Sequence, residues 1–302
     1  MKALRLVEPK KYQIDDIPMP VQDGGHVIIK VEMVGICGSD LSIWKDGRNG
    51  VFGDGKIMGH EFTGIVTDPG PRTDLKAGDR VVGCPLNYCR ECFYCKNGLE
   101  NLCNETVRKG GPGVTIDGAC TSYFAIAADK TFKIDEKLDV RVAALVEPIA
   151  NGHHAVERAN IQAGEKVLIT GGSIIAILCA WWARKRGASV TISEINPDRI
   201  AHLKKYQVAD EIVNLTEEGA LDALKSKIGL GFDKAIECSR PNDALINGTI
   251  IPLLRKGGTI AQVGSMEGTL GFNFFAMQYK EIGYLTCWSI NEADFVAAIA
   301  AA

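Results

Sequence analysis

The sequence predicts a two-domain α/β protein, in which an N-terminal antiparallel β domain precedes a doubly wound parallel sheet. Between residues 2 and about 135, short runs of alternating apolar and polar residues are separated by Gly- and Pro-rich turns. From residue 167 onward, the order strand, glycine turn, helix recurs several times. Such alternation implies parallel strands joined by right-handed crossovers, with helices on both faces of the sheet.

The elements follow from these patterns in chain order. In the β domain, we expect strands at residues 26–34 (HVIIKVEMV) and 62–67. In the second half, we expect strands at 167–170, 189–193, 211–213, 234–237 and 259–263, with helices at 174–186, 199–206, near 220–228 and near 244–254. The predicted domains are a catalytic domain at 1–150, a nucleotide-binding domain at 151–290, and a segment at 291–302 that starts a return to the first domain.

Composition restricts the class of protein. The 302 residues are 46% hydrophobic and 24% charged, which is typical of a soluble globular chain. The net charge of −3 offers no basic face, so we expect no nucleic acid partner. The uncharged stretch 167–183 is interrupted by Gly171 and Gly172, and we expect no membrane association. The start of the chain lacks the apolar run of a signal peptide, and ten cysteines fit a reducing cytoplasm.

Four cysteines within one short loop predict a metal site: Cys89, Cys92, Cys95 and Cys103. Four thiolates form a closed tetrahedral set that favours Zn²⁺ and leaves no open coordination position. We therefore expect a structural zinc. The alternatives are disulfides or separate core cysteines, and an iron–sulfur cluster, whose usual cysteine run is more compact than this one.

The turn after residue 170 is the expected nucleotide site. Only the first glycine of a GxGxxG pattern is in register, and the residues expected at the cofactor are Gly171, Gly172, Ser173, Ile174 and Ile175. Glu194 ends the next strand, where a carboxylate would bind the adenosine ribose and repel a 2′-phosphate, which favours NAD over NADP. Arg199 would stack on the adenine, or simply begin the following helix.

Several further motifs together resemble the zinc-dependent medium-chain alcohol dehydrogenases, in particular the branch that contains sorbitol and threonine dehydrogenases. These motifs are GICGSD, GHEFTG, GDRVVG, the four-cysteine loop, EPIANGHHA, ECS and GGTIAQVG. The resemblance implies a GroES-like catalytic domain and a Rossmann nucleotide-binding domain. It also implies two Zn²⁺ ions per chain, NAD as cofactor with Val263 beside it, and a homodimer or homotetramer. Chains of this family continue beyond the position of Ala302.

The same resemblance implies which residues act. Cys37 and His60 would bind a catalytic zinc, with Glu61 a ligand or a close exchangeable neighbour. Glu147 would act on the metal directly or through water. Ser39 would accept the alcohol proton, although a helix N-cap is the alternative. Asp40 would orient His60 or the Cys37 loop.

The implied reaction transfers a hydride from a secondary alcohol, such as a polyol, cyclitol or amino alcohol, to NAD⁺ and yields the ketone. The alternative is a non-catalytic, zinc-stapled NAD(H)-binding protein. Two departures from the family pattern bear on the function: the first, together with the altered GGSIIA turn, favours the non-catalytic protein, and the second weakens a sorbitol-like assignment. Ser42 stands where many relatives have a proton-relay histidine, and residues 287–291 lack the Arg-Tyr pair of polyol dehydrogenases. The side chains that indicate a more apolar pocket are Trp44, Phe52, Trp288 and Ile290.

Overall fold

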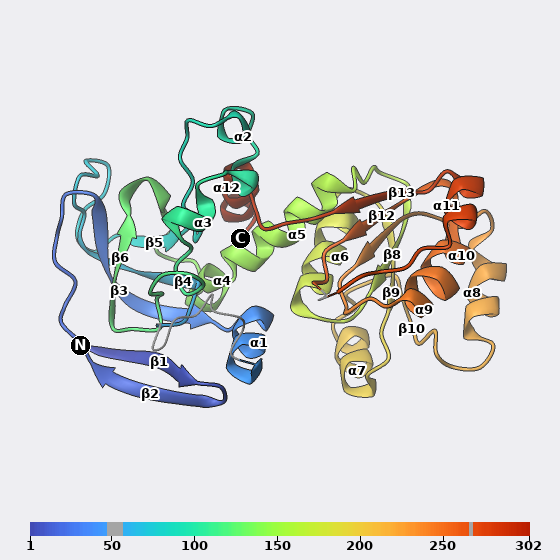
Figure 1. Ribbon diagram of the computed structural model, residues 1–302, viewed down its shortest axis with the longest axis horizontal. Helices are drawn as coiled ribbons and strands as arrows, with labels where there is room; N and C mark the ends of the chain where they lie inside the picture. The colour runs from blue at the N-terminus through green and yellow to red at the C-terminus, as the bar shows by residue number, and fades with distance from the viewer. Residues whose placement is uncertain (47–56, 266–267) are drawn as a thin grey trace. The chain divides into compact units, whose positions relative to one another are not determined.

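The computed structural model describes residues 1–46, 57–265 and 268–302 (Figure 1). The chain forms two compact units. Unit 1 comprises Met1–Ala150 together with Ile290–Ala302, and unit 2 comprises Asn151–Ser289. The chain therefore leaves unit 1 once, within helix α5 (Val146–Arg158), and returns to it after Ser289.

Unit 1 is built on antiparallel strands, as the sequence predicts. A hairpin of β1 (Lys2–Glu8) and β2 (Lys11–Asp16) accompanies a five-stranded sheet in the order β6-β3-β4-β5-β7. The five strands are β6 (Tyr123–Ala127), β3 (His26–Gly35), β4 (Glu61–Asp68), β5 (Arg80–Gly83) and β7 (Thr131–Lys133). Alternate residues of these strands, including Val27, Ile29, Phe62 and Val81, form the apolar core.

The helices of unit 1 are short apart from α5 and the returning helix. They are α1 (Gly38–Asp46), α2 (Phe93–Lys96), α3 (Thr106–Lys109) and α4 (Val140–Ala144), with the 3₁₀ turns η2 (Glu100–Leu102) and η3 (Ala128–Lys130). The chain re-enters unit 1 as α12 (Glu292–Ala301), which begins with a capping box between Asn291 and Asp294. The buried Phe295 ring packs 5.2 Å from that of Phe132, so α12 is part of the core of unit 1.

Unit 2 is a doubly wound parallel sheet, which confirms the predicted fold class. Its six strands run in the order β10-β9-β8-β11-β12-β13. They are β10 (Glu211–Val213), β9 (Ser189–Ser193), β8 (Lys166–Thr170), β11 (Phe232–Glu237), β12 (Leu254–Gln262) and β13 (Gly283–Thr286). The order reverses between β8 and β11, and ligands of such folds bind at the carboxyl ends of strands at this point.

The helices of unit 2 are α6 (Ile174–Lys185), α7 (Pro197–Lys205), α8 (Ala220–Ile228) and α11 (Phe274–Lys280). The helix expected near 244–254 is present and contains a π-type turn: α9 (Asp243–Leu245), η4 (Ile246–Ile250) and α10 (Ile251–Leu253) follow one another directly. Pro252 has no N–H to donate to the carbonyl of Gly248, four residues earlier, and the helical ladder changes just before it.

The residues that flank Cys89 fasten the four-cysteine loop to α12. The Tyr88 hydroxyl donates to the Glu292 carboxylate, which also accepts from Arg90 at 3.1 Å. The buried Lys130 ammonium lies 3.1 Å from the centre of the Tyr88 ring and pairs with Asp129 at 2.8 Å. Loop and returning helix therefore form one packed cluster.

We expect this cluster to stabilise unit 1. We expect Tyr88→Phe to lower the free energy of unfolding by about 1.5–3 kcal/mol, because it removes a hydrogen bond to a charged group. The measurement is denaturant unfolding. Tyr94→Phe is the control, since the Tyr94 hydroxyl has no hydrogen bond within the described residues. Equal losses in the two variants would contradict a fastening role for Tyr88.

Among the residues that the structure describes, no helix is both long enough and apolar enough to cross a membrane.

Candidate active site and cofactor site

The last pair of the β3–β4 ladder brings the proposed metal ligands together. Gly35 of β3 pairs with Glu61 of β4, so Cys37, two residues past Gly35, lies beside His60 and Glu61. One ligand atom from each of Cys37, His60 and Glu61 lies within 4.8 Å of those of the other two. Both His60 and Glu61 are buried. Three ligand-type side chains from two parts of the sequence thus converge.

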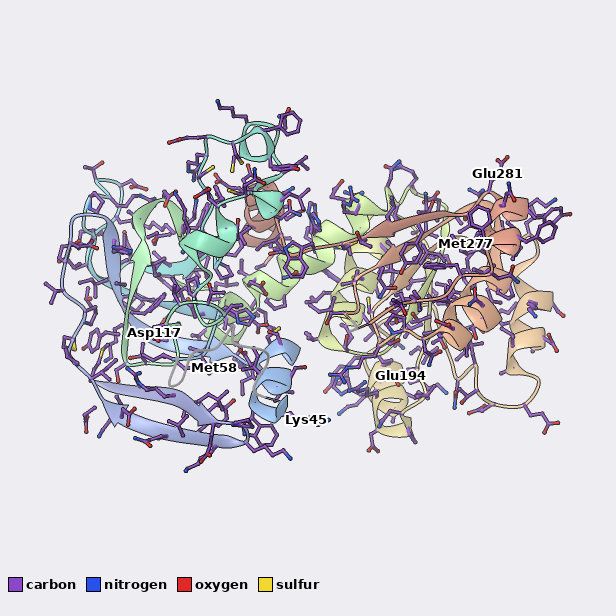
Figure 2. All side chains as sticks on the ribbon, in the orientation of Figure 1. Lys45, Met58, Asp117, Glu194, Met277 and Glu281 are labelled. Carbon is purple, nitrogen blue, oxygen red and sulfur yellow. The ribbon has the colours of Figure 1, made fainter. Side chains whose placement is uncertain are left out.

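Residue 59 must be glycine for His60 to occupy this position. Gly59 has φ +97°, and a Cβ atom there would lie 2.7 Å from both Cys120 Sγ and a Val34 methyl group. The Gly59 and Met58 carbonyls accept hydrogen bonds from the amides of Ala119 and Cys120 at 2.9 and 2.8 Å. Figure 2 labels Met58 on this segment. The backbone before His60 is therefore held by hydrogen bonds to residues 119 and 120 and by close packing around Gly59.

Asp40 lies beside both Cys37 and His60. Its Oδ2 accepts from the Cys37 amide at 2.9 Å, so it holds the Cys37 loop. Its Oδ1 lies 3.7 Å from His60 Nδ1, and neither of these two buried atoms has a hydrogen bond to the part of the chain that the structure describes. A metal-bound histidine commonly presents its second nitrogen to a carboxylate. The pair therefore fits a ligating role for His60 through Nε2.

The electrostatics of this cluster also fit a cation. Burial opposes charging of His60, but the Cys37 hydrogen bond and the Glu147 carboxylate outweigh it and raise its pKa to about 10. Burial and then the charge of Glu147 raise the pKa of Glu61 to about 7. Acidic groups that crowd a buried histidine in this way would be neutralised by a divalent metal, so the residues fit Zn²⁺.

The other predicted catalytic residues lie nearby with less defined roles. Glu147 influences the pKa values of His60 and Glu61 but is not part of the three-residue cluster. Ser39 is the second residue of α1 and is half-buried, so it lies inside the helix and not at the N-cap position. Of the proposed pocket residues, Trp44 packs against the core and Ile290 is buried, while Trp288 is 68% exposed. Phe52 lies outside the described residues.

The four loop cysteines form a compact second cluster. The Sγ atoms lie 3.8 Å apart for Cys89 and Cys95, 3.6 Å for Cys92 and Cys95, and 3.6 Å for Cys103 and Cys89. Sulfurs at 2.3 Å from a central zinc would be about 3.8 Å apart in a tetrahedron. The amides of Glu91 and Cys92 donate to Cys89 Sγ at 3.4 and 3.3 Å. All four cysteines are free, so the structure contains no disulfide here.

The turn after β8 has the features of a nucleotide site. Gly171 has φ +93°, and a Cβ atom there would meet the Cys238–Ser239 backbone at 3.3 Å. Ser173 caps α6 by accepting from the Ala176 amide at 3.4 Å. Ile174 is exposed and Ile175 half-buried at the first turn of this helix. The first-turn amides of α6 have no acceptor within the helix itself, which is the arrangement that phosphate sites at helix N-termini use.

Glu194 lies at the carboxyl end of β9, close to this turn and to the start of α7 (Figure 2). Its carboxylate accepts from the amides of Gly172, Ile195 and Asn196 at 2.6, 2.7 and 2.8 Å. Burial would raise its pKa, but these three bonds and Arg199, at 3.5 Å, hold the pKa below its usual value. Glu194 is thus ionised and fixed in place. The predicted residue Val263 follows β12 and donates to the Glu237 carbonyl at 2.8 Å.

Two features of this end of the sheet were missed by sequence reasoning. Glu237, at the end of β11, is fully buried and accepts from the Ser239 amide at 2.7 Å and from Gln262 at 2.6 Å. It thereby fixes the Ser239 loop against Gly171. The ECS motif contains Glu237, but nothing in the motif indicates a buried network. Ile195, beside Glu194, is an apolar side chain left 64% exposed.

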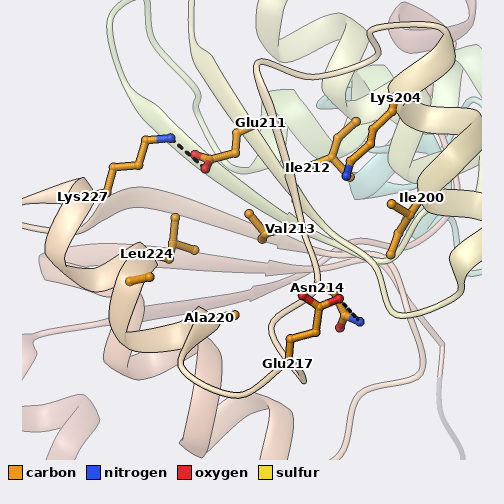
Figure 3. A pocket seen from close by; sticks show the side chains of 11 residues that line it. Ile200, Lys204, Glu211, Ile212, Val213, Asn214, Glu217, Ala220, Leu224 and Lys227 are labelled. Atoms are coloured by element: carbon orange, nitrogen blue, oxygen red, sulfur yellow. Dashed lines mark hydrogen bonds and ion pairs between the residues drawn. The ribbon is translucent and has the colours of Figure 1, made fainter.

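A pocket of about 330 Å³ lies elsewhere in unit 2, along the edge strand β10 between α7 and α8 (Figure 3). Lys227 pairs with Glu211 at 2.7 Å, and Asn214 donates to Glu217 at 3.2 Å. With Lys204, the lining has two cations and two carboxylates, so it presents no net charge. None of the predicted site residues lines it.

Comparisons with known proteins agree with this geometry. Residues 23–136 match the family model "Alcohol dehydrogenase GroES-like domain", and residues 175–302 match "Zinc-binding dehydrogenase". The D-xylulose reductase A of Aspergillus oryzae is 31% identical, over 96% of this chain and 82% of its own. The protein named Probable D-xylulose reductase A of Arthroderma otae is 33% identical, over 96% of this chain and 83% of its own.

Solved structures give the same picture. The 2R,3R-butanediol dehydrogenase of Bacillus subtilis superposes with a TM-score of 0.89 at 25% identity, covering 99% of this chain and 87% of its own. The L-idonate 5-dehydrogenase of Escherichia coli superposes with a TM-score of 0.86 at 25% identity, covering 99% of this chain and 86% of its own. A zinc-binding dehydrogenase of Sinorhizobium meliloti, solved with bound NADP, superposes with a TM-score of 0.87 at 27% identity, covering 99% of this chain and 88% of its own.

Proposed function

Because this chain belongs to the zinc-dependent medium-chain alcohol dehydrogenase family, we propose that it oxidises a secondary hydroxyl group of a small polyol or diol with NAD⁺. The products are the ketone, NADH and a proton. The convergence of Cys37, His60 and Glu61 carries the proposal, since a closed structural site would not need these open, mixed ligands. The relatives' names, which include D-xylulose reductase and butanediol dehydrogenase, support this substrate class.

In this proposal, Cys37, His60 and Glu61 hold the catalytic Zn²⁺. Bound there, Zn²⁺ supplies Lewis-acid chemistry that makes an alcohol hydroxyl more acidic. Asp40 keeps the imidazole and the Cys37 loop in place through its two carboxylate oxygens. Ser39 accepts the alcohol proton, and water or Glu147 passes it on, because Ser42 has no pKa in the physiological range. The four-cysteine loop holds the structural Zn²⁺ and takes no part in the reaction.

The amide groups at the start of α6 bind the cofactor pyrophosphate, and Glu194 binds the adenosine ribose. This assignment rests on the fixed, ionised Glu194 carboxylate and the capped turn at Ser173. Arg199 stays within reach of the adenine edge, and Val263 contacts the cofactor from the end of β12.

The non-catalytic alternative has no support. A protein that only senses NAD(H) would need the structural metal alone, whereas this chain also retains the open ligand cluster. The deciding experiment measures NADH formation at 340 nm with xylitol, butane-2,3-diol, myo-inositol and threonine, with and without a zinc chelator. We expect chelator-sensitive turnover with at least one polyol or diol. A zinc-loaded enzyme that oxidises none of these alcohols would refute the proposal.

Cofactor choice gives a separate prediction. We expect kcat/KM to be higher with NAD⁺ than with NADP⁺, because Glu194 repels a 2′-phosphate. Glu194→Gln should lower the ratio of kcat/KM with NAD⁺ to kcat/KM with NADP⁺ by about tenfold, since one like-charge repulsion is worth on the order of 1–3 kcal/mol. The exposed Glu218→Gln is the control and should leave the ratio unchanged. Equal rates with both cofactors in the unmodified enzyme would remove Glu194 from this role.

We also propose a homo-oligomer in a reducing cytoplasm. In unit 2, β13 is an edge strand, and the neighbouring α11 exposes 73% of Phe274, 75% of Phe275 and 63% of Tyr279. An edge strand beside exposed aromatic residues fits burial against a second copy. Ten free cysteines favour a reducing compartment. Light scattering in solution measures the molar mass, and a monomer at micromolar concentration would contradict this assignment.

A further inference from the structure

We infer that Gly35 is a positioning residue of the catalytic metal site: its missing side chain leaves the space in which the Glu61 carboxylate lies against the metal cluster. This inference rests on the proposed function, in which Glu61 belongs to that cluster. It assigns a role to a residue that neither binds metal nor contacts substrate.

The pairing register supplies the first observation. Gly35 and Glu61 are directly opposite each other in the antiparallel β3–β4 ladder, at its last pair. Side chains of directly opposed residues lie on the same face of a sheet and normally contact each other. Here one of the two has no side chain, and the other, Glu61, is buried.

The space itself supplies the second observation. A Cβ atom built on Gly35 would lie 3.0 Å from Glu61 Cβ and 3.3 Å from Glu61 Cδ, and closer still to Oε2. The whole Glu61 side chain is therefore folded across the Gly35 backbone, and the carboxylate lies where a methyl group would be. No left-handed backbone angle requires glycine at this position, because Gly35 has no positive φ. Only the space accounts for the glycine.

The consequence for the metal site follows from the geometry. With alanine at position 35, Oε2 must leave its present position, which moves the Glu61 carboxylate relative to Cys37 and His60. Residues that orient ligands typically change metal affinity by 10- to 100-fold when they are replaced. Glycine at position 35 thus keeps Glu61 within reach of the metal.

The same loop offers a matched control. Gly38 lies on the other side of Cys37, and a Cβ atom built there meets nothing within 4 Å. Gly38→Ala therefore makes the same chemical change, at nearly the same distance in sequence from Cys37, without touching Glu61. The difference between the two variants isolates the space at Gly35.

The test is the affinity of the Cys37 site for Co²⁺. Metal-free protein is titrated with Co²⁺, and binding is monitored by the visible absorption of the bound ion. We expect Gly35→Ala to weaken Co²⁺ binding by about 10- to 100-fold and to alter the spectrum, and Gly38→Ala to stay within about twofold. In a Glu61→Ala background, adding Gly35→Ala should change affinity by less than about threefold, because the obstructed side chain is gone.

Either of two results would overturn the inference. One is equal behaviour of Gly35→Ala and Gly38→Ala, and the other is a full effect of Gly35→Ala without Glu61. If Gly35→Ala alone fails to fold, the double variant with Glu61→Ala should fold, and its failure would also overturn the inference. Co²⁺ binding to the unmodified protein is measured without substrate. A failure of the proposed function, seen as no turnover, is therefore distinguishable from a failure of the role of Gly35.

Discussion

Cys37→Ser is expected to lower kcat/KM for alcohol oxidation by about 10³-fold while the protein remains folded. Lewis-acid stabilisation by a metal is worth several kcal/mol, and each ~1.4 kcal/mol corresponds to a tenfold change in rate. Serine retains a hydrogen-bonding group, but it is a poor ligand beside His60 and Glu61. The measurements are steady-state rates of NADH formation and zinc content, which should fall by one ion per chain.

Cys84→Ser is the control for this prediction. Cys84 is a buried cysteine of the same unit that belongs to neither metal cluster. We expect this variant to keep its zinc content and most of its activity, although some stability is lost. If Cys37→Ser kept its zinc or its rate, the assignment of the catalytic metal to Cys37, His60 and Glu61 would fail.

In contrast to Cys37→Ser, Cys95→Ser should lose much of its thermal stability and show a smaller direct loss of kcat. The metal closes a loop of 15 residues from Cys89 to Cys103, and closing a loop of that length is worth about 3 kcal/mol. For a unit of this size, that corresponds to a melting temperature lower by about 6–12 °C. Calorimetry with the zinc-loaded protein measures the shift.

Limited proteolysis shows which part of the Cys95→Ser variant is destabilised. Because Tyr88 and Arg90 flank Cys89 and bind Glu292, we expect the residues around α12 to become sensitive to protease together with the loop. At low temperature, where the variant is folded, kcat should stay within about tenfold of the unmodified enzyme. A thermal shift as small as that of Cys37→Ser would mean that the two metals have been assigned to the wrong tasks.

Much of the fold can be read from the sequence, because apolar periodicity and glycine turns are local signals. The strands at 189–193 and 211–213 and the helix at 220–228 have the predicted bounds. The helix predicted near 244–254 is present at residues 243–253, but periodicity does not indicate its π-type turn at Ile246–Ile250, which lies just before Pro252 and its missing N–H.

The candidate site was only partly predictable, since its geometry depends on contacts between distant residues. Motifs name Cys37, His60 and Glu61, but only the β3–β4 register shows that Glu61 lies across Gly35. Likewise, the sequence places Glu194 after a strand, and the structure adds the three amides that fix its carboxylate. The buried network of Glu237 has no signature in the sequence, because its partners Ser239 and Gln262 are common polar residues.

Anomalous diffraction at the zinc absorption edge tests the central claim most directly, because it locates each metal in crystals of the zinc-loaded protein. We expect two peaks per chain, one among Cys37, His60 and Glu61 and one among the four loop cysteines. A single peak at the four cysteines, with none beside Cys37, would contradict it.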